Sequence, residues 1–101
     1  MIARVWHGWT TPENAAAYER LLRTNILPSI ERTSGVRAEF LRRDGPFEVE
    51  FLTIMRFKSI EDVKRFAGEE YWTAVVKPEA HALLKRFCDR VRHYQVVEWQ
   101  S

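Results

Sequence analysis

Apolar and polar residues alternate most clearly in the middle of the chain, where the pattern predicts two paired strands. In the run Phe47–Phe57 every second side chain shares one face, and most of these side chains are apolar. The run Val36–Arg43 precedes it, and Asp44-Gly45 between the two is a strong hairpin signal because both residues tolerate positive φ. We therefore predict a β-hairpin over residues 36–57.

The second strand of this hairpin changes character along its other face. Glu48 and Glu50 begin that face, but Leu52 and Ile54 continue it with apolar side chains. Because helices cover only one side of such a sheet, these two residues need a different cover. The pattern predicts that a second copy of the chain supplies it, packed sheet against sheet with two-fold symmetry.

Stretches with helical spacing flank the hairpin. The first begins at Thr11, a capping residue that is followed by a proline and a glutamate, and it continues with Tyr18, Leu22 and Ile26. Pro28 is expected to end or kink this helix, because its ring clashes with the preceding turn. The second helix is predicted from a Ser59 cap to a stop at Gly68, with an apolar face of Ile60, Val63, Phe66 and Ala67.

The two ends of the chain complete the predicted order. Ile2–Trp9 is rich in strand formers, and Arg90–Trp99 alternates as a last strand. Residues 69–76 are ambiguous, and Pro78 starts a further helix with inward-facing Leu83, Leu84 and Phe87. The order βαββαβ predicts one α+β domain over residues 1–101, a ferredoxin-like antiparallel sheet with helices on one face.

The composition of the chain excludes some classes of function but does not identify one. The chain is 46% hydrophobic and 30% charged, as folded proteins are, and its 13% aromatic share favours a ligand or a partner subunit. A net charge of +2 is too small for a nucleic-acid partner. Cys88 lies in the predicted last helix and is interpreted as a buried thiol. Without a long apolar stretch or a signal-peptide pattern, we expect a cytoplasmic protein and no membrane partner.

Three segments resemble the antibiotic biosynthesis monooxygenase domain family: Met-Ile-Ala-Arg-Val-Trp-His-Gly at residues 1–8, Phe66–Glu69, and His93–Val97. The resemblance spans nearly the whole chain, although its motifs describe the fold better than the chemistry. It implies a dimeric α/β barrel, in which two ferredoxin-like sheets pack face to face, and a pocket between sheet and helices in each subunit. The family includes cofactor-free monooxygenases of aromatic compounds, haem-degrading enzymes and small-quinone oxygenases.

The resemblance argues against haem degradation for this chain. In that branch an Asn on the first strand and a Trp and a His on the second helical segment form the catalytic set. Here the first-strand place holds Trp6 or His7, the helical Trp place is Phe66, and the His place falls near Val76. We therefore expect no haem and no other cofactor.

The function that the resemblance implies is a cofactor-independent monooxygenase acting on a small aromatic or quinone-like compound. Such a site needs a base that titrates near neutral pH, an apolar slot and a donor for the developing oxyanion. Histidine is the natural base, and His7 between two tryptophans is our candidate. The expected substrate-binding residues are Trp6, Trp9, Phe66, Trp72, His81 and His93.

The alternative is a non-catalytic dimeric module that binds a small hydrophobic ligand or a protein. Under this interpretation the histidines lie at the surface or in the interface, and Trp72 is ordinary core. Arg4 would face into the sheet and pair with Glu50 or Glu98. No metal-binding spacing, P-loop or nucleophile elbow occurs in the sequence. An enclosed apolar cavity with an inward histidine would favour the enzyme, whereas a filled core would favour the module.

Overall fold

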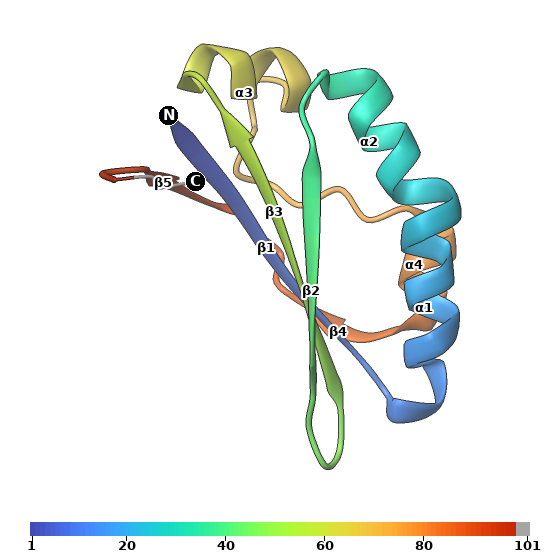
Figure 1. Cartoon of the computed structure of the whole chain (residues 1–101). Helices are drawn as coiled ribbons and strands as arrows, with labels where there is room; N and C mark the ends of the chain where they lie inside the picture. Colours follow the sequence, from blue (N-terminus) through green and yellow to red (C-terminus); the bar gives the residue numbers. More distant parts are fainter. Residues whose placement is uncertain (99–101) are drawn as a thin grey trace.

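An antiparallel sheet with helices on one of its faces makes up the fold (Figure 1). The computed structural model describes residues 1–98, so the predicted strand end at Trp99 lies outside the described residues. The elements are β1 (Ile2–Thr10), η1 (Pro12–Asn14), α1 (Ala15–Leu21), η2 (Leu22–Ile26), α2 (Leu27–Ser34), β2 (Ala38–Asp44), β3 (Val49–Phe57), α3 (Ile60–Ala67), α4 (Pro78–Leu83), β4 (Leu84–Phe87) and β5 (Arg92–Gln95). The predicted α+β class and βαββαβ order are confirmed, with the last strand in two pieces. Within the described part of the chain, every helix is too short or too polar to cross a membrane.

The strand order is ferredoxin-like. The sheet runs β2-β3-β1, and β4 and β5 both pair with the remaining edge of β1. In the β1–β3 ladder Gly8 lies opposite Phe51 and His7 lies opposite Leu52. Because neighbours across a ladder share a face, even-numbered residues of β1 accompany the helix-facing residues of β3. Odd-numbered residues of β1 lie on the other face, with Leu52 and Ile54.

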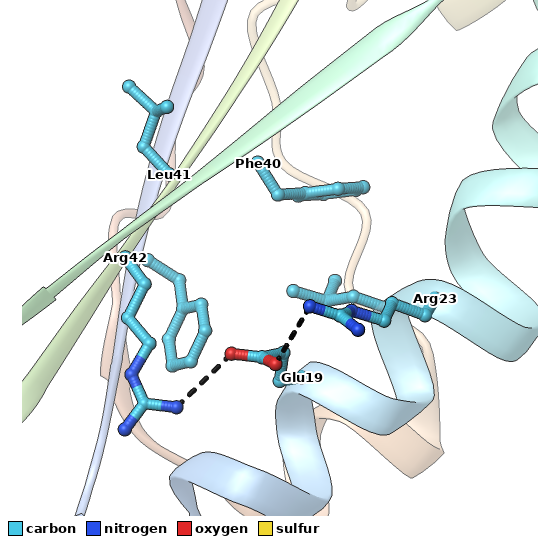
Figure 2. A pocket seen from close by; sticks show the side chains of 7 residues that line it. Glu19, Arg23, Phe40, Leu41 and Arg42 are labelled. Atoms are coloured by element: carbon cyan, nitrogen blue, oxygen red, sulfur yellow. Dashed lines mark hydrogen bonds and ion pairs between the residues drawn. The ribbon is translucent and has the colours of Figure 1, made fainter.

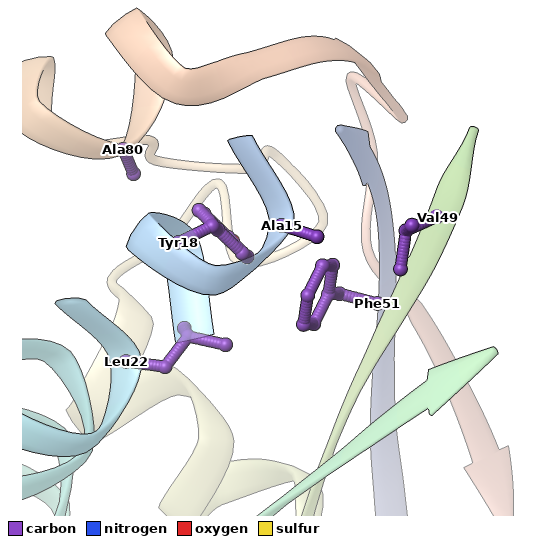
Figure 3. Packing of buried hydrophobic residues seen from close by; sticks show 6 residues of the cluster. All are labelled: Ala15, Tyr18, Leu22, Val49, Phe51 and Ala80. Carbon is purple, nitrogen blue, oxygen red and sulfur yellow. The ribbon is translucent and has the colours of Figure 1, made fainter. Parts of the chain in front are cut away.

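The core fills the space between the sheet and the helices. One buried cluster joins the first helical segment, β3 and α4 (Figure 3). In this cluster the rings of Tyr18 and Phe51 meet edge to face, with centroids 4.8 Å apart. A second cluster joins α3 to the end of β3 through Met55, Phe57 and Val63. The alternation along β3 is therefore real: Val49, Phe51, Met55 and Phe57 are all buried.

The helix ends and the hairpin occur where the sequence predicts them. Thr11 accepts a hydrogen bond from the Asn14 amide, Ser59 caps α3 by accepting from the Asp62 amide, and the helix stops at Gly68. Gly35 closes α2 with a φ of 73°, a left-handed conformation that suits glycine. The predicted hairpin is also present, with Asp44 opposite Val49 in the ladder.

The first helix does not end at Pro28, contrary to one of the outcomes expected from the sequence. Its segment Leu22–Ile26 widens into a π-helix, in which the Leu27 amide donates to the Leu22 carbonyl, and α2 then continues through Pro28 to Ser34. A proline has no N–H and its ring crowds the preceding turn, so a wider turn before it accommodates the ring without ending the helix.

The prediction for the last quarter of the chain is wrong in two respects. The helix that begins at Pro78 ends at Leu83, and Leu84–Phe87 forms a strand against β1. Cys88 is therefore not helical: it follows this strand, and its amide donates to the His7 carbonyl at 3.0 Å. The remaining edge of β1 offers backbone groups that a strand satisfies and a longer helix would leave unpaired.

Candidate functional sites

The residues selected from the sequence do not gather at one site. His7 and Trp9 lie on the helix-free side of the sheet, whereas Trp6 and His93 lie on the helix-covered side. On the covered side they divide again, because Trp6 and His81 lie near β4, while Phe66, Trp72 and His93 lie near α3 and β5. Three separate clusters therefore replace the single predicted pocket.

His7 is oriented by a carboxylate on the helix-free side. Its Nδ1 lies 2.8 Å from Glu50 Oε2, so the carboxylate accepts from a protonated Nδ1. The imidazole stacks on Trp9 with ring centroids 5.9 Å apart, and Arg86 covers the Trp9 ring at 3.7 Å. His7 cannot share a site with a pocket between sheet and helices, because the sheet itself separates them.

Trp6 is fixed in the sheet–helix interface near β4. Its Nε1 donates to the Cys88 carbonyl at 2.8 Å, and its ring packs beside Phe87, which in turn contacts His81. The indole lies across Gly8, where an added Cβ would come within 2.9 Å of it. These contacts make Trp6 a packed structural residue in this conformation.

Arg4 and His93 form the third cluster, and Glu50, one of the two carboxylates expected beside Arg4, is not its partner. Glu50 belongs to the other face, and Arg4 Nη1 donates instead to the Tyr71 carbonyl at 2.6 Å and to His93 Nε2 at 3.0 Å. The guanidinium also lies over the Phe66 ring. Since Arg4 only donates, His93 Nε2 accepts and the neutral ring carries its proton on Nδ1.

The environment of this cluster disfavours positive charge. Burial, and then the nearby Arg4 charge, lower the pKa of His93 below its ordinary value. Burial also lowers the pKa of Arg4. Tyr71 stacks edge-on against both Trp72 and His93, so Trp72 lies at the margin of the cluster, with 40% of its surface exposed.

The helix-free side of the sheet, called the open face from here on, is a surface of mixed character. The ladders place on it Ala3, Val5, His7, Trp9, Glu39, Leu41, Arg43, Glu50, Leu52, Ile54, Arg56, Arg86, Arg92 and Tyr94. Leu41 and Tyr94 are 45% and 50% exposed, and Leu52 and Ile54 are half-buried. Sequence reasoning found Leu52 and Ile54 and missed Leu41, although the adjacent apolar residues Phe40 and Leu41 must lie on opposite faces of a strand.

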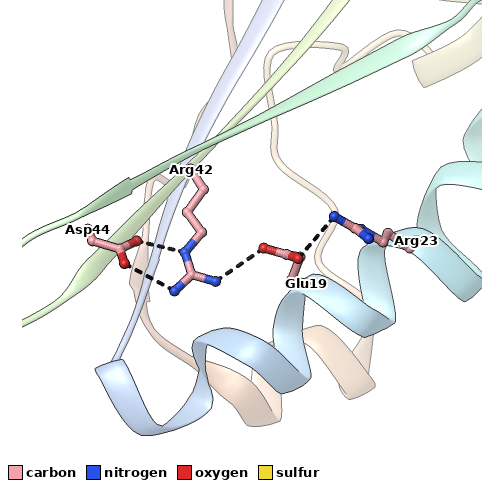
Figure 4. A network of polar contacts seen from close by, with 4 residues as sticks. All are labelled: Glu19, Arg23, Arg42 and Asp44. Atoms are coloured by element: carbon pink, nitrogen blue, oxygen red, sulfur yellow. Dashed lines mark hydrogen bonds and ion pairs between the residues drawn. The ribbon is translucent and has the colours of Figure 1, made fainter.

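A small hollow of about 110 Å³ lies between β2 and the first helical segment (Figure 2). Phe40 and Leu41 extend to opposite sides of β2 there. Figure 4 shows that its charged side chains already pair with one another, because Arg42 bonds Asp44 and Glu19, and Glu19 also pairs with Arg23. Bonds to Asp44 and Glu19 raise the pKa of Arg42, and the bond from Arg42 lowers the pKa of Asp44.

A larger hollow of about 550 Å³ lies where β3 ends and α3 begins. Residues from the end of α2, the end of β3 and α3 line it: Met1, Thr33, Ser34, Val36, Arg56, Phe57, Lys58, Asp62, Arg65 and Phe66. Neither hollow is lined by a histidine. Sequence reasoning found only Phe66 among these residues, because segments distant in the chain form both hollows.

Comparison with known proteins does not assign the chain to a family. No family model matches the chain, and no curated protein or solved structure matches it significantly. The structure itself defines an α+β domain with ferredoxin-like topology.

Proposed function

We propose that this chain is a self-associating module that pairs with a second copy through its open face. The observation that carries the proposal is the row of apolar side chains that no helix covers: Leu41, Leu52 and Ile54 lie side by side across β2 and β3. Val5 extends the row onto β1, opposite Ile54. Large contiguous apolar surfaces on a sheet of this kind mark interaction sites.

The size of the open face suits a dimer. A sheet about four strands wide with central strands of nine residues measures roughly 30 Å by 19 Å. That flat area of roughly 570 Å², before side-chain relief is counted, approaches the ~800 Å² per partner of a standard interface. Removing apolar surface from water contributes ~25 cal/mol per Å², which makes the covered arrangement favourable.

The face also carries features that set the geometry of pairing. Charged groups lie around the apolar row, including the His7–Glu50 pair and Arg86, which pairs with Glu48. Polar groups around an apolar centre are the usual anatomy of an interface, and they fix its register. Two-fold pairing of two such faces would give the dimeric α/β barrel that the sequence resemblance implies.

The oligomeric state tests this proposal directly. We expect light scattering after size exclusion to give twice the mass of one chain, and Leu41→Asp to give a single chain. Leu41 is already 45% exposed in one copy, so its replacement should leave the folded monomer intact. The control is Val75→Asp, on a loop residue that is 87% exposed. A monomeric wild type at micromolar concentration would refute the proposal.

We propose cofactor-independent oxygenation as a second candidate function, because His7 has the geometry of an oriented base. Glu50 holds Nδ1 and leaves Nε2 available, and Trp9 supplies an aromatic wall beside the ring. His7 would take a proton from an electron-rich phenol, whose anion then reduces dioxygen. The substrate supplies all four electrons; one oxygen atom forms a new carbonyl and the other leaves as water.

Oxygen consumption in the presence of quinols and anthrone-type phenols tests this second function. We expect turnover above the uncatalysed rate and a loss of at least tenfold in His7→Gln, as removal of a general base requires. His81→Gln is the matched control, since His81 lies on the other side of the sheet at α4. Equal rates for wild type and His7→Gln would exclude His7 as the base.

A further inference from the structure

We infer that the larger hollow, between the ends of α2 and β3 and the start of α3, binds a small aromatic carboxylate. The hollow of about 550 Å³ falls within the size range of ligand sites. Its position at one end of the sheet is separate from the His7 cluster, which lies along the open face. The inference rests on neither functional proposal, and one lining residue of the hollow, Arg56, also lies on the open face.

The apolar part of the lining selects an apolar ligand body. Phe57 is buried in the second core cluster, and its ring packs against Phe66 with centroids 5.7 Å apart. Val36 and Met1 line the same hollow. The half-buried ring of Phe66 offers a flat ligand a surface on which stacked or edge-on contacts form. An inorganic anion would gain nothing from this surface.

The charged part of the lining selects an anion. Three cationic side chains, Arg56, Lys58 and Arg65, line the hollow beside a single carboxylate, Asp62. Arg65 pairs with Asp62 at 2.8 Å, and Arg56 pairs with Glu39 at 3.2 Å. Lys58 makes no ion pair within residues 1–98, so its charge remains available to a ligand carboxylate.

Helix dipoles do not alter this balance. The end of α2 at Ser34 brings partial negative charge toward the hollow, while the start of α3 near Asp62 brings partial positive charge. The two contributions are opposite in sign and therefore offset each other in part. The side chains therefore set the local potential, and their excess of cations fits a monoanion.

Titration of the full chain with 1-naphthylacetate, followed by backbone amide NMR shifts, tests the inference. We expect shifts at Val36, Lys58 and Phe66, and weaker binding as salt is raised. Lys58→Gln should lower the affinity about threefold, the effect of losing one exposed charge pair. Lys85→Gln is the control, because Lys85 lies on β4 near the opposite end of β1.

The uncharged amide of the same compound distinguishes recognition of the anion from non-specific hydrophobic binding. We expect 1-naphthylacetamide to bind more weakly than the carboxylate at low salt. Equal binding of the two, unchanged affinity in Lys58→Gln, or shifts confined to other surfaces would each overturn the inference. None of these outcomes depends on the oligomeric state or on oxygen consumption, so a failure here leaves both functional proposals intact.

Discussion

Thr10 is a fully buried residue whose hydroxyl has no hydrogen-bond partner in the described part of the chain. A buried polar group without a partner costs about 1–3 kcal/mol of desolvation. We expect Thr10→Val, which keeps the shape and removes the hydroxyl, to raise the free energy of unfolding by about 1 kcal/mol in urea. Thr53→Val, on the same side of the sheet but partly exposed, should change it little. A destabilised Thr10→Val would show that the hydroxyl is satisfied in solution.

A second single residue, His93, makes the free energy of unfolding depend on pH. Its pKa is lowered in the folded state by burial and by Arg4, so the unfolded chain binds a proton at higher pH than the folded chain does. Stability from this group is therefore complete above about pH 6.5 and decreases as the pH falls below it, toward the folded pKa. We expect the urea midpoint of the wild type to fall more between pH 7.5 and 5.5 than that of His93→Gln. An equal decrease in the wild type and His93→Gln would contradict this prediction.

At the scale of elements, Gly8 allows β1, β4 and the Trp6 indole to pack closely. A Cβ at this position would lie 2.9 Å from Trp6 Cη2 and 3.1 Å from Leu84 Cδ2. We expect Gly8→Ala to lower the free energy of unfolding by about 1–3 kcal/mol, the cost of overpacking. The penalty should shrink in a Trp6→Leu background, measured as a double-mutant cycle in urea. An equal penalty in both backgrounds would point to backbone effects alone.

Elements that depend on neighbouring residues were predictable from the sequence, and those decided by distant partners were not. The Asp44-Gly45 hairpin and the Ser59 and Gly68 helix ends each rest on a few adjacent residues. Leu84–Phe87 has apolar residues at both ends, a spacing that suits a helical turn as well as a strand. Its state is set by the unpaired edge of β1, almost the whole chain away.

At the scale of the whole molecule, the alternation of β3 correctly placed Leu52 and Ile54 on the face that helices leave open. The face of His7 was not predictable, because a slip of one residue in register moves every side chain of a strand to the other side. Nor could the sequence show either hollow, since each is closed by segments that meet only in the folded chain. The candidate site residues, which were chosen by residue type alone, therefore lie in three separate clusters.

Pairing through the open face has a consequence for thermal unfolding. When unfolding also separates two chains, the midpoint rises with protein concentration, because association stabilises the folded state by mass action. A hundredfold increase adds about 2.7 kcal/mol per dimer, which for two chains of 101 residues corresponds to roughly 6 °C. We expect this rise for the wild type and Val75→Asp, measured by calorimetry, and a constant midpoint for Leu41→Asp. A wild-type midpoint independent of concentration would mean that the open face separates before the fold is lost, or never pairs, and the proposed module would then not be held together by its apolar row.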